Sequence, residues 1–248
     1  MLFALMPICL PRILYLIDEW LERCKIDLKS RGASLEIHIK QTLSRTLSRK
    51  LYQFHICPIS NLQAGPNDRE EIDLIINFKN VVLVAEIKCI KYPMEVRDYH
   101  NATKRLKEGA VQIQRKAQFL MVNKNLLNKW VGDIDDKEII SVVITNYPLF
   151  SGQNLEGIPI IDFLIMDAYA DAGRITDMKA NFATGVFDTQ TKTEEVFYTS
   201  EDEFGANLKR HFEFPLAVER LRNQYTIKKT PIVSNENFRL YAETAIFD

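Results

Sequence analysis

The chain has 248 residues, of which 46% are apolar, and its net charge at pH 7 is −1. This length and apolar content allow a large buried core, which excludes a disordered chain and favours one elaborated domain or a domain with an extension. The four cysteines form no C-x-x-C pair and the four histidines show no metal-ligand spacing, so a disulfide framework and a zinc site are both disfavoured.

The N-terminal segment, residues 1–31, opens with an apolar run. The run lacks the basic stretch and the small-residue cleavage site of a secretion signal, and it is too short to span a bilayer as a helix. We therefore expect a cytoplasmic protein without membrane attachment. An amphipathic helix is expected next, and its apolar side is expected to dock on the core or on a second subunit. That side carries Ile13, Leu14, Ile17, Trp20 and Leu21, opposite Asp18, Glu19 and Glu22.

A longer helix is expected after Gly32. Ser34 is a suitable N-cap residue, and Glu36 follows it in the first turn. Apolar residues then recur at helical spacing, at Leu35, Ile39, Leu43 and Leu47.

Two apolar, β-branched stretches, residues 71–78 and 81–88, are typical of neighbouring strands. Only Lys79 and Asn80 separate them, which favours a tight hairpin turn. Lys-Asn is a weak turn sequence, and a longer loop would shift the pairing of the strands.

A two-residue turn fixes the register of this hairpin. Phe78 then faces Val81, and counting back along both strands places Asp73 opposite Glu86. Side chains two residues apart on a strand point to the same face, so Lys88 joins the two carboxylates.

Opposed carboxylates repel each other in a sheet unless a cation lies between them. Mg²⁺ binds through one or two carboxylates and bridges to phosphate oxygens, and a neighbouring lysine can hold a nucleophilic water or stabilise charge on a phosphate. Asp73, Glu86 and Lys88 therefore suggest a phosphodiesterase site. The alternative is an ion-paired, solvent-exposed strand face, since such pairs are common.

Basic residues are frequent between Lys88 and the end of the next expected helix, residues 109–120. Residues 1–130 contain 21 Lys and Arg against 13 Asp and Glu, whereas residues 131–248 contain 11 against 20. A basic cluster of this kind can neutralise a nucleic-acid backbone, although single charges commonly only solvate a face. The residues expected to contact nucleic acid are Lys91, Arg97, Lys104, Arg105, Lys107 and Arg115, and Lys116 follows them.

Two further strands are expected at residues 138–145 and 158–166. In the loop between them, Asn146 or Tyr147 could contact substrate, or the loop is a turn with a packed tyrosine. Residues 178–248 then alternate between strand and helix patterns. The elements expected there are strands at 181–187, 195–199, 225–232 and 238–247 and helices at 201–212 and 216–222.

The order of charged residues resembles the PD-(D/E)XK nuclease superfamily, also called restriction-endonuclease-like. Glu36 in the first helix, Asp73 in one strand and Glu86-Ile87-Lys88 in the next resemble its motifs. The resemblance covers residues 32–166. It implies an α/β fold in which an α-β-β-β-α-β core has a mixed central sheet flanked by helices. We place this core at 32–177, between the N-terminal segment (1–31) and a C-terminal α+β extension (178–248) packed on it.

The resemblance also implies roles for the charged residues. Asp73 and Glu86 would bind Mg²⁺, with Mn²⁺ as a substitute, and the Ile87 carbonyl would be a further ligand. Glu36 would complete the shell or orient water, and Lys88 would assist the nucleophile or the transition state.

Two assignments in this comparison stay open. Many members carry a glutamine near the site on the helix after the E-x-K strand, for which Gln112 is the first choice and Gln114 the second. The proline of the family's name has no counterpart before Asp73. Asp68, Glu70 and Glu71 therefore compete with Asp73 for the role of the acidic residue.

These features predict a Mg²⁺-dependent nuclease that hydrolyses phosphodiester bonds, in DNA rather than RNA. A homodimer or a larger defence or repair assembly is compatible with the sequence. The first alternative is a catalytically inactive module of the same fold that binds nucleic acid or assembles with proteins. In the second alternative, the carboxylates form a structural network and the basic face binds a protein.

Overall fold

The structure is a computed structural model that describes residues 15–21, 23–25, 30–51, 53–181, 188–222, 225–234 and 239–247. Its centre is a six-stranded sheet. In spatial order the strands are β1 (Phe54–Ile56), β4 (Leu74–Phe78), β5 (Val81–Lys88), β6 (Glu138–Thr145), β8 (Ile158–Asp162) and β7 (Gln153–Leu155). Strands β5, β6 and β8 run parallel, whereas β1, β4 and β7 pair antiparallel with their neighbours. The predicted mixed sheet is therefore confirmed.

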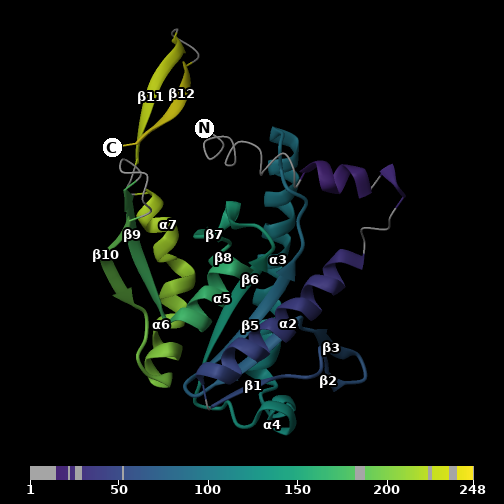
Figure 1. The fold of residues 1–248 in the computed structure, drawn as a ribbon. Helices are drawn as coiled ribbons and strands as arrows, with labels where there is room; N and C mark the ends of the chain where they lie inside the picture. The colour runs from purple at the N-terminus through teal and green to yellow at the C-terminus, as the bar shows by residue number, and fades with distance from the viewer. Residues whose placement is uncertain are drawn as a thin grey trace.

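Helices cover both faces of this sheet (Figure 1). Alternate side chains of β4 and β5 enter two separate apolar clusters, as the pleat of a strand requires. Leu74 and Ala85 pack with α2 (Arg31–Lys50) and α5 (Phe163–Ala172). Ile75 and Val84 pack on the other face, with α3 (Val96–Val122) and α4 (Asn125–Val131). The chain thus forms an α/β fold with three layers.

The hairpin of β4 and β5 has the predicted register. Leu74 lies opposite Ala85 and Asn77 opposite Val82, and continuing this pairing by one residue places Asp73 opposite Glu86. The prediction of one continuous strand at residues 71–78 is wrong, however. β3 (Asp68–Glu71) forms a separate hairpin with β2 (Asn61–Gly65), because the Ile72 amide turns away to donate to the Ser60 carbonyl. Asp73 consequently lies immediately before β4.

Three helix boundaries differ from the sequence expectations. α2 begins at Arg31, so Ser34 lies within its first turn and is not the N-cap. α3 begins thirteen residues before the expected helix, because Ala102 and Leu106 extend its buried face. The expected strand at 158–166 ends at Asp162, whose carboxylate accepts hydrogen bonds from the amides of Leu164 and Ile165 and so caps α5.

The short helix of residues 15–21 packs with the opposite side from the one predicted. Asp18 is 4% exposed and ion-paired with Arg31, whereas Trp20 is 58% exposed and Ile17 is also exposed. The buried ion pair orients this helix, so docking of its apolar side on the core is wrong, whereas docking on a second subunit stays a prediction. Residues 1–14 and Glu22 lie outside the described part of the chain.

The described residues of the C-terminal segment form two helices and two hairpins. These are β9 (Arg174–Asn181) with β10 (Asp188–Val196), α6 (Glu201–Glu213), α7 (Leu216–Arg222), and β11 (Tyr225–Ser234) with β12 (Arg239–Phe247). α6 buries Phe204, Leu208 and Phe212 in the cluster that contains α2 and α5, whereas hairpin β11–β12 extends away from the sheet (Figure 1). The strand expected at 181–187 falls outside the described residues, apart from Asn181. None of the described helices is both long and apolar enough to cross a bilayer.

Candidate functional site

A polar hollow of about 410 Å³ lies beside the carboxyl end of β5, between α3, β3 and the start of α2. It is lined by all six residues that the sequence assigns to catalysis or metal binding. These are Glu36, Asp73, Glu86, Ile87, Lys88 and Gln112. Segments far apart in the chain therefore converge on one surface.

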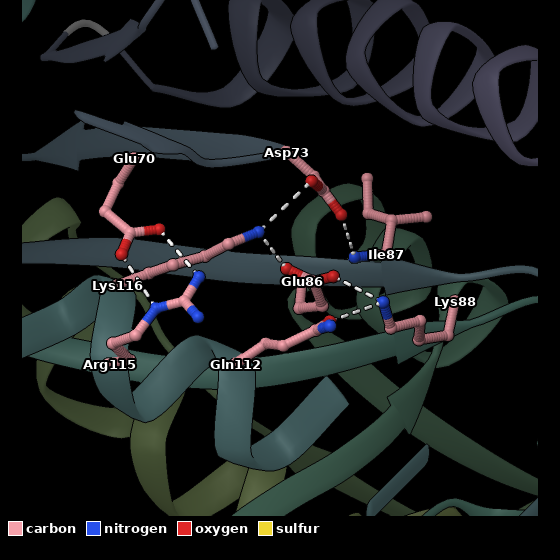
Figure 2. A network of polar contacts seen from close by, with 8 residues as sticks. All are labelled: Glu70, Asp73, Glu86, Ile87, Lys88, Gln112, Arg115 and Lys116. Atoms are coloured by element: carbon pink, nitrogen blue, oxygen red, sulfur yellow. Dashed lines mark hydrogen bonds and ion pairs between the residues drawn. The ribbon is translucent and has the colours of Figure 1, made fainter. Parts of the chain in front are cut away.

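β5 supplies the acid and the lysine at the centre of the hollow. Glu86 and Lys88 are two residues apart and point to the α3 side of the sheet, while the Ile87 side chain packs in the cluster on the other side. The Lys88 ammonium donates to Glu86 Oε1 at 2.5 Å and to Gln112 Oε1 at 2.7 Å (Figure 2). This fixes the lysine between a strand and a helix, with only 17% of its side chain exposed.

Gly109 allows α3 to approach this pair closely. A Cβ atom at this position would lie 3.0 Å from Lys88 Cε, 3.1 Å from Lys88 Cγ and 3.6 Å from Glu86 Cγ. Glycine costs about 1 kcal/mol relative to alanine inside a helix, and here it leaves the space that the lysine stem fills. Gly109 is thus a supporting residue that the sequence prediction did not include.

Asp73 is held against β5 by a backbone contact. The Ile87 amide donates to Asp73 Oδ2 at 2.7 Å, so the residue between Glu86 and Lys88 fixes the second carboxylate. Burial and the nearby Glu86 charge raise the pKa of Asp73, against the lowering effects of the Ile87 amide and the two lysines. Asp73 therefore loses its proton less readily than an ordinary aspartate.

Glu36 reaches the same hollow from α2. Burial is the main cause of the raised pKa of its carboxyl, and the charges of Asp73, Glu71 and Glu86 raise it further. Three carboxylates from α2, β5 and the start of β4 thus lie within each other's electrostatic field, which makes the hollow attractive to a cation.

Lys116 neutralises part of this negative charge. Its ammonium is ion-paired with Glu86 Oε2 and lies 3.6 Å from Asp73 Oδ1 (Figure 2). Only 8% of its side chain is exposed. Lys116 belongs to the basic cluster that was expected to neutralise phosphates, and its place beside the two acids was not predicted. The available signal was its spacing, because Gln112 and Lys116 are four residues apart and share one face of α3.

The residues expected to contact nucleic acid fall into two groups. Arg105 and Arg115 line the hollow, and the Arg115 guanidinium binds both oxygens of Glu70, at 2.7 and 2.9 Å (Figure 2). Lys107 instead pairs with Glu156 at 2.6 Å. The structure does not bring the other three into the hollow: Lys91 lies 5.3 Å from the centre of the Tyr15 ring, and Arg97 and Lys104 are exposed on α3.

The residues that compete for two of these roles have other partners or positions. Gln114 donates to the Glu156 carbonyl, whereas Gln112 contacts Lys88. Glu70 pairs with Arg115, Glu71 lines the hollow and Asp68 is exposed.

The loop after β6 is held by internal contacts. The Asn146 amide bonds to the backbone of Ile90 in both directions, and Tyr147 packs against Tyr92 with 5.2 Å between ring centres. These contacts are those of a packed turn.

The carboxylates at the centre of the hollow are engaged by ammonium and amide groups of the chain itself. Glu86 uses one oxygen for each lysine, and Asp73 uses Oδ2 for a backbone amide. In the part of the chain that the structure describes, no group of three or more His, Cys, Asp or Glu side chains is arranged to hold a metal ion. Carboxylate oxygens are donors that hard cations prefer, and here the Lys116 ammonium lies between those of Glu86 and Asp73.

Comparison with known proteins gives no match: no protein-family model, no curated protein and no solved structure corresponds to this chain.

Proposed function

We propose that this protein is a divalent-cation-dependent nuclease that hydrolyses phosphodiester bonds, with DNA as the expected substrate. The observation that carries the proposal is the convergence of Asp73, Glu86 and Lys88 in one hollow, with the lysine oriented by Gln112. Acids and a lysine from adjacent strands are the residues that the PD-(D/E)XK resemblance requires.

The order of elements around the site supports the same proposal. α2 is followed in the central sheet by β1, β4 and β5, then by α3 and β6. This is a helix, three strands, a helix and a strand, with hairpin β2–β3 inserted before β4 and the short helix α4 inserted before β6. Fold alone does not establish an activity, so the proposal depends on the side chains in the hollow.

Asp73, Glu86 and Glu36 line the hollow together with Glu70 and Glu71, and these three would hold the cation. Their side chains would have to rearrange around it, because among the described residues no three such groups are arranged to hold a metal ion. Mg²⁺ or Mn²⁺ bound there would act as a Lewis acid and lower the pKa of a water molecule. The raised pKa values of Asp73 and Glu36 fit this role, since a nearby positive charge favours the ionised form of both groups.

Lys88 is the residue that would act on the reacting atoms. Its ammonium is a charged donor held by Glu86 and Gln112, and it is partly open to the hollow. It can hold the attacking water and stabilise negative charge that develops on the phosphate. Gln112 is a positioning residue in this scheme, because its carbonyl contacts the lysine.

Arg105 and Arg115 would bind the nucleic-acid backbone at the rim of the hollow. A guanidinium that binds both oxygens of a carboxylate has the geometry that also fits a phosphate, and Arg115 forms such a pair with Glu70. A phosphate of the substrate would replace Glu70 on this arginine.

One observation favours a second candidate, a catalytically inactive module that binds nucleic acid. Both oxygens of Glu86 are engaged by lysines of the same chain, which is also the arrangement of a structural ion network. In that case the arginines would bind nucleic acid without cleavage.

The test is a cleavage assay on supercoiled, linear and single-stranded DNA and on RNA, in Mg²⁺, Mn²⁺ or EDTA. The wild-type protein should cleave DNA only with a cation, and Lys88→Ala and Asp73→Ala should abolish cleavage while the circular-dichroism spectrum is retained. Lys50→Ala, at an exposed position near the end of α2, is the matched control and should cleave as the wild type does. Cation-independent retention of DNA without cleavage would favour the inactive module, and full activity in Lys88→Ala would refute the assignment of the lysine.

A further inference from the structure

Lys116 lies where a cation would neutralise the two acids of the site. Its ammonium contacts Glu86 Oε2 and is 3.6 Å from Asp73 Oδ1, while Lys88 occupies the other oxygen of Glu86. Two negative charges are thus matched by two positive charges within the chain itself. This match is important because the three side chains are buried, with exposures of 8% for Lys116, 12% for Asp73 and 5% for Glu86, and unpaired buried charges are costly.

We propose that Lys116 is an internal competitor of the divalent cation, and that its ammonium must leave the Asp73–Glu86 pair before the cation binds. The inference rests on the proposed function for the identity of the site. It adds a residue that sets how tightly the cation is held.

The two lysines are not equivalent, and the difference identifies Lys116 as the one that leaves. Lys88 is also held by the neutral carbonyl of Gln112 at 2.7 Å, a contact that persists when the charge on Glu86 is shared with another cation. The charged contacts of Lys116 are to the two acids themselves. A divalent cation bound to these acids would therefore repel the Lys116 ammonium. It would also neutralise the negative charge that attracts this ammonium.

The surroundings offer the displaced side chain a new position. The hollow has a volume of about 410 Å³ and is also lined by Glu71 of β3. A lysine has a flexible four-carbon stem, and rotation about it can carry the ammonium from the Asp73–Glu86 pair toward this carboxylate.

Cation binding in the absence of nucleic acid tests the inference directly. The test compares the wild-type protein with Lys116→Met, which keeps the apolar stem and removes the charge. Lys50→Met is the matched control. Mn²⁺ affinity is measured by isothermal titration calorimetry, and the melting temperature is measured in EDTA and in Mn²⁺. Lys116→Gln is a second variant that keeps a hydrogen-bond donor if the methionine variant does not fold.

The expected result is that Lys116→Met or Lys116→Gln binds Mn²⁺ about tenfold or more tightly than the wild type, while Lys50→Met binds as the wild type does. The Lys116 variants should melt lower than the wild type in EDTA and recover the difference in Mn²⁺. Equal or weaker Mn²⁺ binding by the variants, or no binding by any of the proteins, would overturn the inference.

The binding and cleavage assays fail independently. Tighter Mn²⁺ binding by the variants without cleavage of any nucleic acid would leave this inference standing and reject the proposed function. Cleavage by the wild type with unchanged Mn²⁺ affinity in the Lys116 variants would reject this inference and leave the proposed function standing.

Discussion

Replacing Gly109 with alanine should disturb the candidate lysine without removing any polar group. The new Cβ would lie 3.0 Å from Lys88 Cε and 3.1 Å from Lys88 Cγ. Carbon atoms pack best at about 3.5 to 4.0 Å, so the lysine stem must move by about 0.5 Å or α3 must shift outward by a similar distance. Movement of the lysine stem would alter both contacts of its ammonium, whereas an outward shift of α3 would lengthen only the contact with Gln112.

The effects on stability and on activity should differ in size. Alanine gains about 1 kcal/mol over glycine in helix propensity, whereas forcing an extra carbon into a packed region costs about 1 to 3 kcal/mol. The net change in the free energy of unfolding should therefore be a loss of about 0 to 2 kcal/mol. Cleavage should fall about 10- to 100-fold, because small displacements of a reacting group are costly to catalysis.

Urea unfolding and the cleavage assay together measure this prediction. Gly32→Ala is the control for stability, since open space surrounds that position in α2, and it should stabilise the protein. If Gly109→Ala stabilises the protein as much as Gly32→Ala does and leaves cleavage unchanged, the close packing of α3 on Lys88 has no functional role.

Three further predictions concern other parts of the structure. Burial lowers the pKa of His211 to about 4; the unfolded chain then takes up the proton first as pH falls below 6.5, so the free energy of unfolding should drop by about 2 kcal/mol between pH 7 and pH 5. Urea titrations should show that His211→Phe removes this part of the pH dependence, and an unchanged pH dependence would contradict the assignment. Asp162→Ala should cost about 2 to 3 kcal/mol, because Asp162 caps α5 and accepts from the Ser151 hydroxyl at 2.8 Å, whereas Asp162→Asn should lose less in the same urea assay. Glu70→Gln should weaken the ion pair with Arg115 and raise the salt concentration that elutes the protein from immobilised DNA. Arg115→Ala should lower that concentration, and the reverse order would reject the role of Arg115.

The centre of the site was predictable because it depends on short-range pairing. The register of β4 and β5 follows from two apolar strands with two residues between them, and it places Asp73 beside Glu86. The turn sequence itself is weak, and the structure shows what supports it: Lys79 and Asn80 both bond to Asp202 of α6, at 2.6 and 2.9 Å. That support comes from 122 residues further along the chain, so local sequence could not reveal it.

Features that depend on long-range packing were missed or wrong. The prediction oriented the short N-terminal helix by its apolar residues. In the structure, the ion pair of Asp18 with Arg31 determines which side of this helix is buried. The predicted strand at 158–166 extends beyond its true end at Asp162, because the residues on both sides of Asp162 are apolar. Only the hydrogen bonds that the Asp162 carboxylate accepts show that a helix begins there. Lys116 was one basic residue among many until α3 was placed over the acids.

The hydrogen bond from the Ile87 amide to Asp73 has a consequence for how the chain folds. If β5 slipped by one residue against β4, every side chain of β5 would exchange faces. Glu86 and Lys88 would then face the apolar cluster beneath α2, and the Asp73 carboxylate would lose its hydrogen bond from the Ile87 amide. Misaligned hairpins are thereby penalised by the same charged groups that line the hollow, so a chain that has reached its native alignment has also assembled its acids and its lysine.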